Sequence, residues 1–292
     1  MKTFAGIDKK YAGFKNASIL LQSIPYDGTS TWGKGADKGF DAFLNAAENM
    51  ELYDIETNQQ VFKRGIHILP EINEKTSPEA VFNSVRNNCR ELLKTDKFIT
   101  SFGGEHSISI GIIDAFREKY KNLTVLQLDA HADLRESYLG SEYNHACAMY
   151  LANKNTNLIQ VGIRSMDISE KQHLNSDNCF FARDICGRTE WFDKAINLMT
   201  NEVYLSIDLD VLDPSIMPAT GTPEPGGLTW FETINFLRQV FANKNVVGFD
   251  IVEFAPIEKL ISPDFLVAKL YYKLLSYKYE NDQYRSRKKF YA

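Results

Sequence analysis

The sequence predicts an α/β fold with a central, mostly parallel sheet, and two kinds of observation support this prediction. The first is a set of short apolar runs, rich in β-branched residues, at positions 97–102, 124–128, 202–207 and 246–252. Because both faces of a parallel sheet are covered by helices, its strands read as continuous apolar runs. The second is the presence of helix-start signals around these runs, since alternating strands and helices form a parallel sheet flanked by helices.

Three predicted helices begin at recognisable capping residues. Ser77-Pro78-Glu79 begins a run that continues to Leu93, with a hydroxyl that can cap the helix and a proline at its first position. Thr229 and Glu232 have the spacing of a capping box, in which each side chain bonds the backbone N–H of the other. Ser262-Pro263-Asp264 begins the last predicted helix.

Each predicted strand ends in polar residues that can bind metal ions. In chain order these are Glu105-His106, Asp129-Ala130-His131-Ala132-Asp133, Asp208-Leu209-Asp210 and Glu253. The carboxyl ends of parallel strands lie at one edge of the sheet, where ligands bind. In an extended chain, residues two apart point to the same side, so Asp129, His131 and Asp133 converge. The same argument brings Asp208 and Asp210 together.

The charge and chemistry of these residues predict a two-metal hydrolytic site. The four negative charges of Asp129, Asp133, Asp208 and Asp210 balance the charges of two divalent cations. The negative charge of Glu253 is then left unbalanced. A mixed set of imidazoles and carboxylates favours manganese, although it also suits zinc. A close metal pair turns water into a nucleophile near neutral pH. Turn formation or helix capping would explain any one of these residues, but not Asp-x-His-x-Asp together with Asp-x-Asp.

Five ordered motifs resemble the ureohydrolase family, which contains arginase, agmatinase, guanidinobutyrase and formimidoylglutamase. They are the segments 103–107, 128–135, 206–214, 221–227 and 250–256, and the resemblance runs from about Leu20 to Leu275. It implies a three-layer α/β/α sandwich of the arginase-like fold, formed by a single domain over residues 1–292. It also implies a homo-oligomer, either a trimer or a hexamer.

The resemblance assigns roles to residues of this chain. It implies two Mn²⁺ ions per subunit, one bound by His106, Asp129, Asp133 and Asp208, and the other by Asp129, His131, Asp208 and Asp210. The implied catalytic residues are Asp133, which holds the attacking hydroxide, Glu253, which binds the guanidinium group, and His145, which transfers protons near the leaving amine. Glu105 stands where many family members have Asp, and its carboxylate is expected to support His106.

The segment 135–144 is expected to select the substrate, and it resembles agmatinases, as do the segments 24–30 and 51–54. The predicted reaction is therefore hydrolysis of agmatine to urea and putrescine, a step of polyamine biosynthesis. Arg135 is expected to pair with Glu136 or another nearby acid, but an arginine free to bind a carboxylate would favour 4-guanidinobutyrate. Arginase and formimidoylglutamase activities also stay open.

Two other features of this region are interpreted as structural. Glu136 and Glu142 would suit a substrate that is cationic at both ends, yet each one alone is better interpreted as a solvated surface charge. Cys147, two residues after His145, is interpreted as a small packed residue. The four cysteines have no metal-ligand or redox-pair spacing, so we expect reduced thiols.

Two other classes of function are less well supported by the sequence. A binuclear phosphoesterase would also place Asp and His at strand ends, but the Gly-Asn-His element that usually supplies its further ligands is missing. A metal-binding protein without catalytic activity would be marked by loss of a ligand, yet every implied ligand position is filled.

Composition argues against nucleic acid and membrane partners. The net charge is −5, which gives no general basis for binding nucleic acid. The basic segment 285–289 is expected to be a solvated end or a subunit contact. No stretch approaches the roughly 20 apolar residues needed to cross a bilayer, and residues 1–13 lack the apolar core of a signal peptide. We therefore expect a cytoplasmic enzyme whose partner is a small guanidine.

Overall fold

The computed structural model describes residues 2–290, with side chains described for residues 2–280. Its centre is one sheet of eight strands in the order β2-β1-β3-β8-β7-β4-β5-β6. The strands are β1 Ile19–Ile24, β2 Ile66–Ile68, β3 Phe98–Gly103, β4 Leu123–Leu128, β5 Asn157–Ile163, β6 Cys179–Phe181, β7 Glu202–Asp208 and β8 Asn245–Val252. Every pairing between them is parallel.

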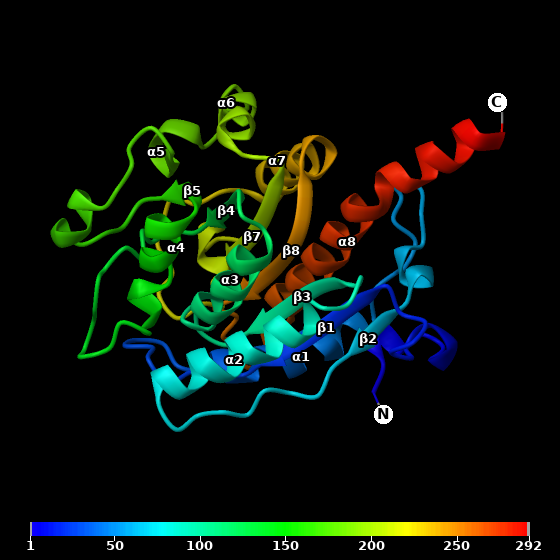
Figure 1. Cartoon of the computed structure of the whole chain (residues 1–292), viewed down its shortest axis with the longest axis horizontal. Coiled ribbons are helices and arrows are strands. Elements are labelled where there is room, and N and C mark those ends of the chain that lie inside the picture. The colour runs from blue at the N-terminus through cyan, green and yellow to red at the C-terminus, as the bar shows by residue number, and fades with distance from the viewer. Residues whose placement is uncertain (1, 291–292) are drawn as a thin grey trace.

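Helices cover both faces of the sheet, which confirms the predicted three-layer arrangement (Figure 1). They are α1 Gly39–Ala47, α2 Pro78–Leu92, α3 Ile108–Lys119, α4 Tyr150–Asn155, α5 Ala182–Ile185, α6 Trp191–Leu198, α7 Trp230–Asn243 and α8 Ile261–Phe290. One apolar core joins α1, α6, α7 and α8 to one face of the sheet. A second core joins α2, α3 and α4 to the other face.

The predicted helix starts are confirmed, with small differences at the ends. Ser77 accepts a hydrogen bond from the backbone N–H of Ala80, and α2 ends at Leu92, one residue before the predicted end. Thr229 and Glu232 form the predicted capping box at the start of α7. The last helix, α8, begins at Ile261, one residue before the predicted capping segment.

Strand register brings the predicted site residues together. Leu128 of β4 lies beside Ile207 of β7, so the residues that follow them, Asp129 and Asp208, leave the sheet side by side. Asp208 in turn lies beside Val252 of β8, the residue before Glu253. Parallel pairing therefore delivers three acidic residues to one edge of the sheet.

The rest of the chain adds three observations. Helix α8 continues past the edge of the sheet (Figure 1), and the side chains of the basic segment 285–289 lie outside the described residues. Among the described residues, no helix combines the length and apolarity that a membrane span requires. All four cysteines lie in the described part of the chain and are free thiols.

Candidate metal centre and active site

The predicted site residues gather around one cavity at the carboxyl edge of the sheet. The cavity has a volume of about 320 Å³. Its lining includes seven of the predicted site residues, namely His106, His131, Asp133, His145, Asp208, Asp210 and Glu253. The remaining one, Asp129, is fully buried and lies behind the lining. The candidate metal-binding residues and Glu253 therefore come from the carboxyl ends of β3, β4, β7 and β8 and from the loops that follow them.

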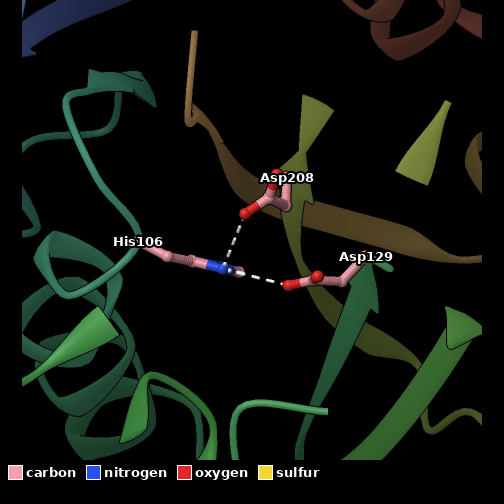
Figure 2. A group of neighbouring side chains, drawn as sticks. All are labelled: His106, Asp129 and Asp208. Atoms are coloured by element: carbon pink, nitrogen blue, oxygen red, sulfur yellow. Dashed lines mark ion pairs between the residues drawn. The ribbon is translucent and has the colours of Figure 1, made fainter. Parts of the chain in front are cut away.

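The first candidate metal position lies at the ring of His106. Its Nδ1 is 3.0 Å from Asp129 Oδ2 and 3.3 Å from Asp208 Oδ2. Dashed lines mark these two ion pairs in Figure 2. Asp133 Oδ2 is 3.1 Å away from the same nitrogen. This buried nitrogen has no hydrogen-bond partner. A ring nitrogen that faces three carboxylates fits a cation held between them.

The second candidate position lies beside the first and shares Asp129 with it. His131 Nδ1 is 2.8 Å from Asp210 Oδ2 and 3.7 Å from Asp129 Oδ1. The ligand atoms of Asp129, His131 and Asp210 all lie within 4.8 Å of one another. Gln127 donates to Asp129 and the backbone N–H of Ala130 donates to Asp210, which fixes both carboxylates. The residues therefore fit a pair of cations that share one ligand.

Crowded negative charge is the main electrostatic feature of this site. Burial and the charge of Asp129 raise the pKa of Asp133 to about 7. Burial and neighbouring carboxylates also raise the pKa values of Asp208 and Glu253 well above the ordinary range. Burial would lower the pKa of His106, but the surrounding carboxylates raise it instead. All of these pKa shifts indicate that positive charge between the carboxylates would stabilise the site.

Two of the predicted catalytic residues adopt a strained backbone. Asp133 has φ 54° and Glu253 has φ 63°, in the left-handed region that residues other than glycine rarely occupy. The backbone N–H of Glu253 donates to Gly104 over 2.8 Å, and Asp133 O accepts from Met149 over 3.0 Å. Such conformations cost about 1–3 kcal/mol and cluster at functional sites. In both Asp133 and Glu253, the residue with this conformation also lines the cavity.

The ring of His106 is supported by a chain of hydrogen bonds that the sequence analysis did not identify. Its Nε2 lies 3.0 Å from Ser206 Oγ, which donates to Asp250 over 2.8 Å. Tyr204 donates to the same carboxylate over 2.6 Å. Glu105, from which we predicted this support, instead accepts hydrogen bonds from Thr29 and Ser107.

His145 lines the same cavity and is held by Thr29, another residue that the sequence analysis did not single out. The backbone N–H of His145 donates to Thr29 Oγ1 over 3.0 Å, and the ring Nδ1 lies 3.1 Å from the same oxygen. The ring of Tyr138 approaches edge-on, with ring centroids 6.1 Å apart. Burial lowers the pKa of His145 to about 4, so its imidazole is neutral at neutral pH.

The outer part of the cavity carries one ion pair. Arg135 Nη2 lies 3.5 Å from Asp167 Oδ2, and its guanidinium group lies 4.6 Å from the centre of the Tyr138 ring. Arg135 thus pairs with a nearby acid, as predicted, and Asp167 is the partner. Glu136 and Glu142 are exposed and outside the cavity lining, as expected for surface charges. Cys147 is buried outside the lining too.

Comparisons with known proteins add to this geometry. The model of the Arginase family matches residues 17–276. An N(1)-aminopropylagmatine ureohydrolase from Synechocystis sp. is 34% identical over 275 residues, which cover 90% of this chain and 90% of that protein. An agmatinase from Pyrococcus horikoshii is 30% identical and covers 89% of this chain and 92% of its own length.

Solved structures agree with these relatives. The agmatine ureohydrolase of Thermoplasma volcanium has a TM-score of 0.86 at 28% identity, over 97% of this chain and 96% of that one. Arginase from Bacillus cereus, at 23% identity and a TM-score of 0.76, shares the fold over 89% of this chain and 98% of its own.

A parallel α/β sandwich with acidic and histidine clusters at the carboxyl ends of its strands defines the class as an arginase-like hydrolase fold. The chain belongs to the arginase family, and the resemblance predicted from Leu20 to Leu275 is confirmed. It is a ureohydrolase, an enzyme that hydrolyses C–N bonds of linear amidines.

Proposed function

We propose that the protein is a binuclear manganese hydrolase that converts agmatine to urea and putrescine, as a step of polyamine biosynthesis. The observation that carries this proposal is the pair of candidate metal positions that share Asp129 and lie beside the same cavity as Glu253. A second candidate substrate is N(1)-aminopropylagmatine, because four relatives of that name are 32–34% identical, whereas the agmatinases compared are 30–31% identical.

Both manganese ions would be held by residues of this chain. The proposed ligands are His106, Asp129, Asp133 and Asp208 for one ion, and Asp129, His131, Asp208 and Asp210 for the other. Oxygen-rich sites with a few imidazoles suit manganese. When bound, the two ions would lower the pKa of a water molecule enough for it to attack an electrophilic carbon near neutral pH.

Protein side chains would perform the other steps. Glu253 binds the planar guanidinium group with two charge-assisted hydrogen bonds and orients its carbon for attack. Asp133 accepts a hydrogen bond from the attacking water and aligns it. His145 takes up the proton that the attacking water loses and delivers it to the leaving amine as the bond between this carbon and the alkyl nitrogen breaks. Water is consumed, and urea and the amine are released.

The outer part of the cavity would recognise the far end of the substrate. Asp167 is a partly exposed carboxylate there. Its Oδ2 forms the ion pair with Arg135, and its Oδ1 accepts hydrogen bonds from the backbone N–H and hydroxyl of Ser169. The ammonium group of agmatine would compete with Arg135 for Asp167, whereas the carboxylate of 4-guanidinobutyrate would bind Arg135. We also propose a homo-oligomer, either a trimer or a hexamer, as the family resemblance implies, and a cytoplasmic location, as expected from the composition.

Urea release is the direct test. The manganese-loaded protein is assayed side by side with agmatine, N(1)-aminopropylagmatine, arginine and 4-guanidinobutyrate, each with a chelator control. We expect chelator-sensitive urea from agmatine or its aminopropyl derivative. Preference for 4-guanidinobutyrate or arginine would overturn the proposed substrate, and absence of urea from every compound would overturn the proposed function.

Replacing Asp167 tests how the enzyme recognises the end of the substrate that is distant from the guanidinium group. Because Asp167→Asn removes the negative charge that would hold the distal ammonium, we expect KM for agmatine to rise by about tenfold, the effect of one lost charged hydrogen bond. The value of kcat should change little, since the guanidinium end is untouched. Asp177→Asn, a change at an exposed aspartate outside the cavity lining, is the control. An unchanged KM in Asp167→Asn would contradict the assignment.

A further inference from the structure

Thr29 connects the candidate proton-transfer residue to a buried carboxylate. Its hydroxyl donates to Glu105 Oε1 over 2.9 Å. The same oxygen accepts the backbone N–H of His145 over 3.0 Å and lies 3.1 Å from His145 Nδ1. Thr29 is nearly buried and Glu105 is completely buried. One hydroxyl oxygen thus contacts a carboxylate, a backbone amide and an imidazole.

The hydrogen bonds of this oxygen determine which nitrogen of His145 carries the hydrogen. A hydroxyl has one hydrogen to donate and two lone pairs that accept. The hydrogen of Thr29 is directed to Glu105, whose carboxylate also accepts from the backbone N–H and hydroxyl of Ser107. Both lone pairs of Thr29 Oγ1 therefore face His145. One accepts the backbone N–H, and the other can only accept a hydrogen from Nδ1.

We infer that Thr29, oriented by Glu105, is the positioning residue of His145, because it fixes the ring hydrogen on Nδ1 and leaves Nε2 with a free lone pair. His145 lines the cavity, so Nε2 is the ring nitrogen available to reacting groups. Nε2 can then take up a proton and pass it to the leaving amine, while Nδ1 stays anchored. This inference rests on the proposed function, in which His145 transfers a proton.

The same contacts explain why a carboxylate is buried at position 105. Glu105 makes no hydrogen bond or ion pair with a candidate metal ligand, although it precedes His106 in the chain. A buried carboxylate is costly unless it is hydrogen-bonded. Its partners are the backbone N–H and hydroxyl groups of Thr29 and of Ser107, the residue just before α3. Many family members have aspartate at position 105, and the glutamate found here is the residue that orients Thr29.

Kinetics of matched threonine variants test this inference. Thr29→Val removes the hydroxyl with little change of shape, whereas Thr29→Ser keeps it. With whichever guanidine the wild-type protein hydrolyses, we expect Thr29→Val to lower kcat by about tenfold to a hundredfold, part of the contribution typical of proton transfer. KM and manganese affinity, the latter measured by calorimetry, should stay unchanged. Thr29→Ser should restore kcat, and Thr189→Val, at an exposed threonine, is the control.

A double-variant cycle shows whether Thr29 acts through His145. In a His145→Ala background, Thr29→Val should lower kcat no further, because the group that it positions is gone. Independent, additive losses would overturn the inference. So would an equal loss in Thr29→Ser and Thr29→Val.

The ring hydrogen can be located without any activity. In the protein loaded with diamagnetic zinc, ¹⁵N-histidine NMR should place the hydrogen of His145 on Nδ1 in the wild type and in Thr29→Ser. The His145→Ala variant assigns the resonance. We expect Thr29→Val to shift the hydrogen partly to Nε2. Hydrogen on Nε2 in the wild type would overturn the inference, whereas failure to release urea from any guanidine would overturn only the proposed function.

Discussion

At the scale of single residues, burial gives His145 a neutral ring over a wide pH range. Its pKa is lowered to about 4, and burial is the main cause. A histidine with a lowered pKa is neutral at every pH above that value, so its protonation cannot stop turnover near pH 6. We therefore predict that His145→Gln lowers kcat by about a hundredfold or more, yet leaves the midpoint of the acid limb of the pH profile in place.

The measurement is the pH dependence of urea release in both proteins. His173→Gln, at a histidine outside the cavity lining, should match the wild type in rate and profile. If the acid limb disappears in His145→Gln, His145 is the group that titrates there, and its environment in the structure cannot explain the profile.

Glu253 gives a second prediction at this scale. Glu253→Gln would remove the proposed charge-assisted pair with the guanidinium group, an interaction of about 1.5–3 kcal/mol. We expect KM to rise by about tenfold to a hundredfold, with both manganese ions retained by metal analysis. Glu136→Gln, at an exposed glutamate outside the cavity lining, should leave KM unchanged. Loss of metal from Glu253→Gln would make Glu253 a metal-binding residue instead.

Site residues could be predicted from the sequence where the residues that meet are close together in the chain. Asp129, His131 and Asp133 lie within five residues of one another, and their spacing predicted that the side chains meet. The structure brings them to one site, although residues 129–133 form a loop, with φ 54° at Asp133, rather than the extended segment that the spacing argument assumed. Thr29 and His145 are 116 positions apart in the chain and form a contact that no local pattern marks. Ser206 carried a usable signal, because it lies two residues before Asp208 on the same strand and therefore points to the same side.

At the scale of elements, the sequence predicted the middle of the sheet and omitted its outer strands. The four predicted strands, β3, β8, β7 and β4, are neighbours in the sheet, and each ends at candidate site residues. Strands β2 and β6 have three residues each, too few for a clear apolar run. Strands β1 and β5 are longer and almost fully buried, so their apolar runs could have identified them. Strand order depends on pairing between distant segments, which the sequence alone did not specify.

Helix α8 is attached to the turn before η4 (Val61–Arg64) by a buried cluster of charges, and this attachment is open to test. Lys273, with only 9% of its side chain exposed, lies 2.9 Å from Asp54 Oδ2 and also contacts Glu56. Arg238 of α7 lies 2.7 Å from Glu56. Removing one partner of a buried ion pair leaves an uncompensated charge, so we predict that Lys273→Met lowers the free energy of unfolding by about 3 kcal/mol.

The pH dependence of this loss follows from Asp54. Burial would raise its pKa, but hydrogen bonds from Thr57 and Lys273 lower it below the ordinary value. A lowered carboxyl pKa contributes stability above about pH 4, and that contribution is lost as the pH falls and Asp54 is protonated. Urea unfolding should therefore show a smaller gap between wild type and Lys273→Met at pH 3 than at pH 7. Lys171→Met, at an exposed lysine, is the control, and an equal gap at both pH values would contradict the role of Asp54.

At the scale of the whole molecule, the fold class was predictable because alternation of strands and helices leaves few arrangements. The predicted sandwich and the family are confirmed, whereas a single domain over residues 1–292 stays a prediction. The homo-oligomer stays a proposal, because the sequence has no spacing pattern for subunit surfaces that is comparable to the metal motifs.

We predict that the buried carboxylates make the stability of the whole fold depend on bound metal. Asp129, Asp208 and Asp210 are almost completely buried and close together, so their charges repel one another unless cations lie between them. A ligand that binds only the folded state at about a hundred times its Kd adds about 2.7 kcal/mol of stability. In a chain of 292 residues this corresponds to a rise in Tm of about 5 °C. Scanning calorimetry with manganese and with a chelator should show that rise. The Asp129→Ala variant loses one of the two ligands that the proposed ions share and should show a much smaller rise. An equal rise in both proteins would place the stabilising ion elsewhere.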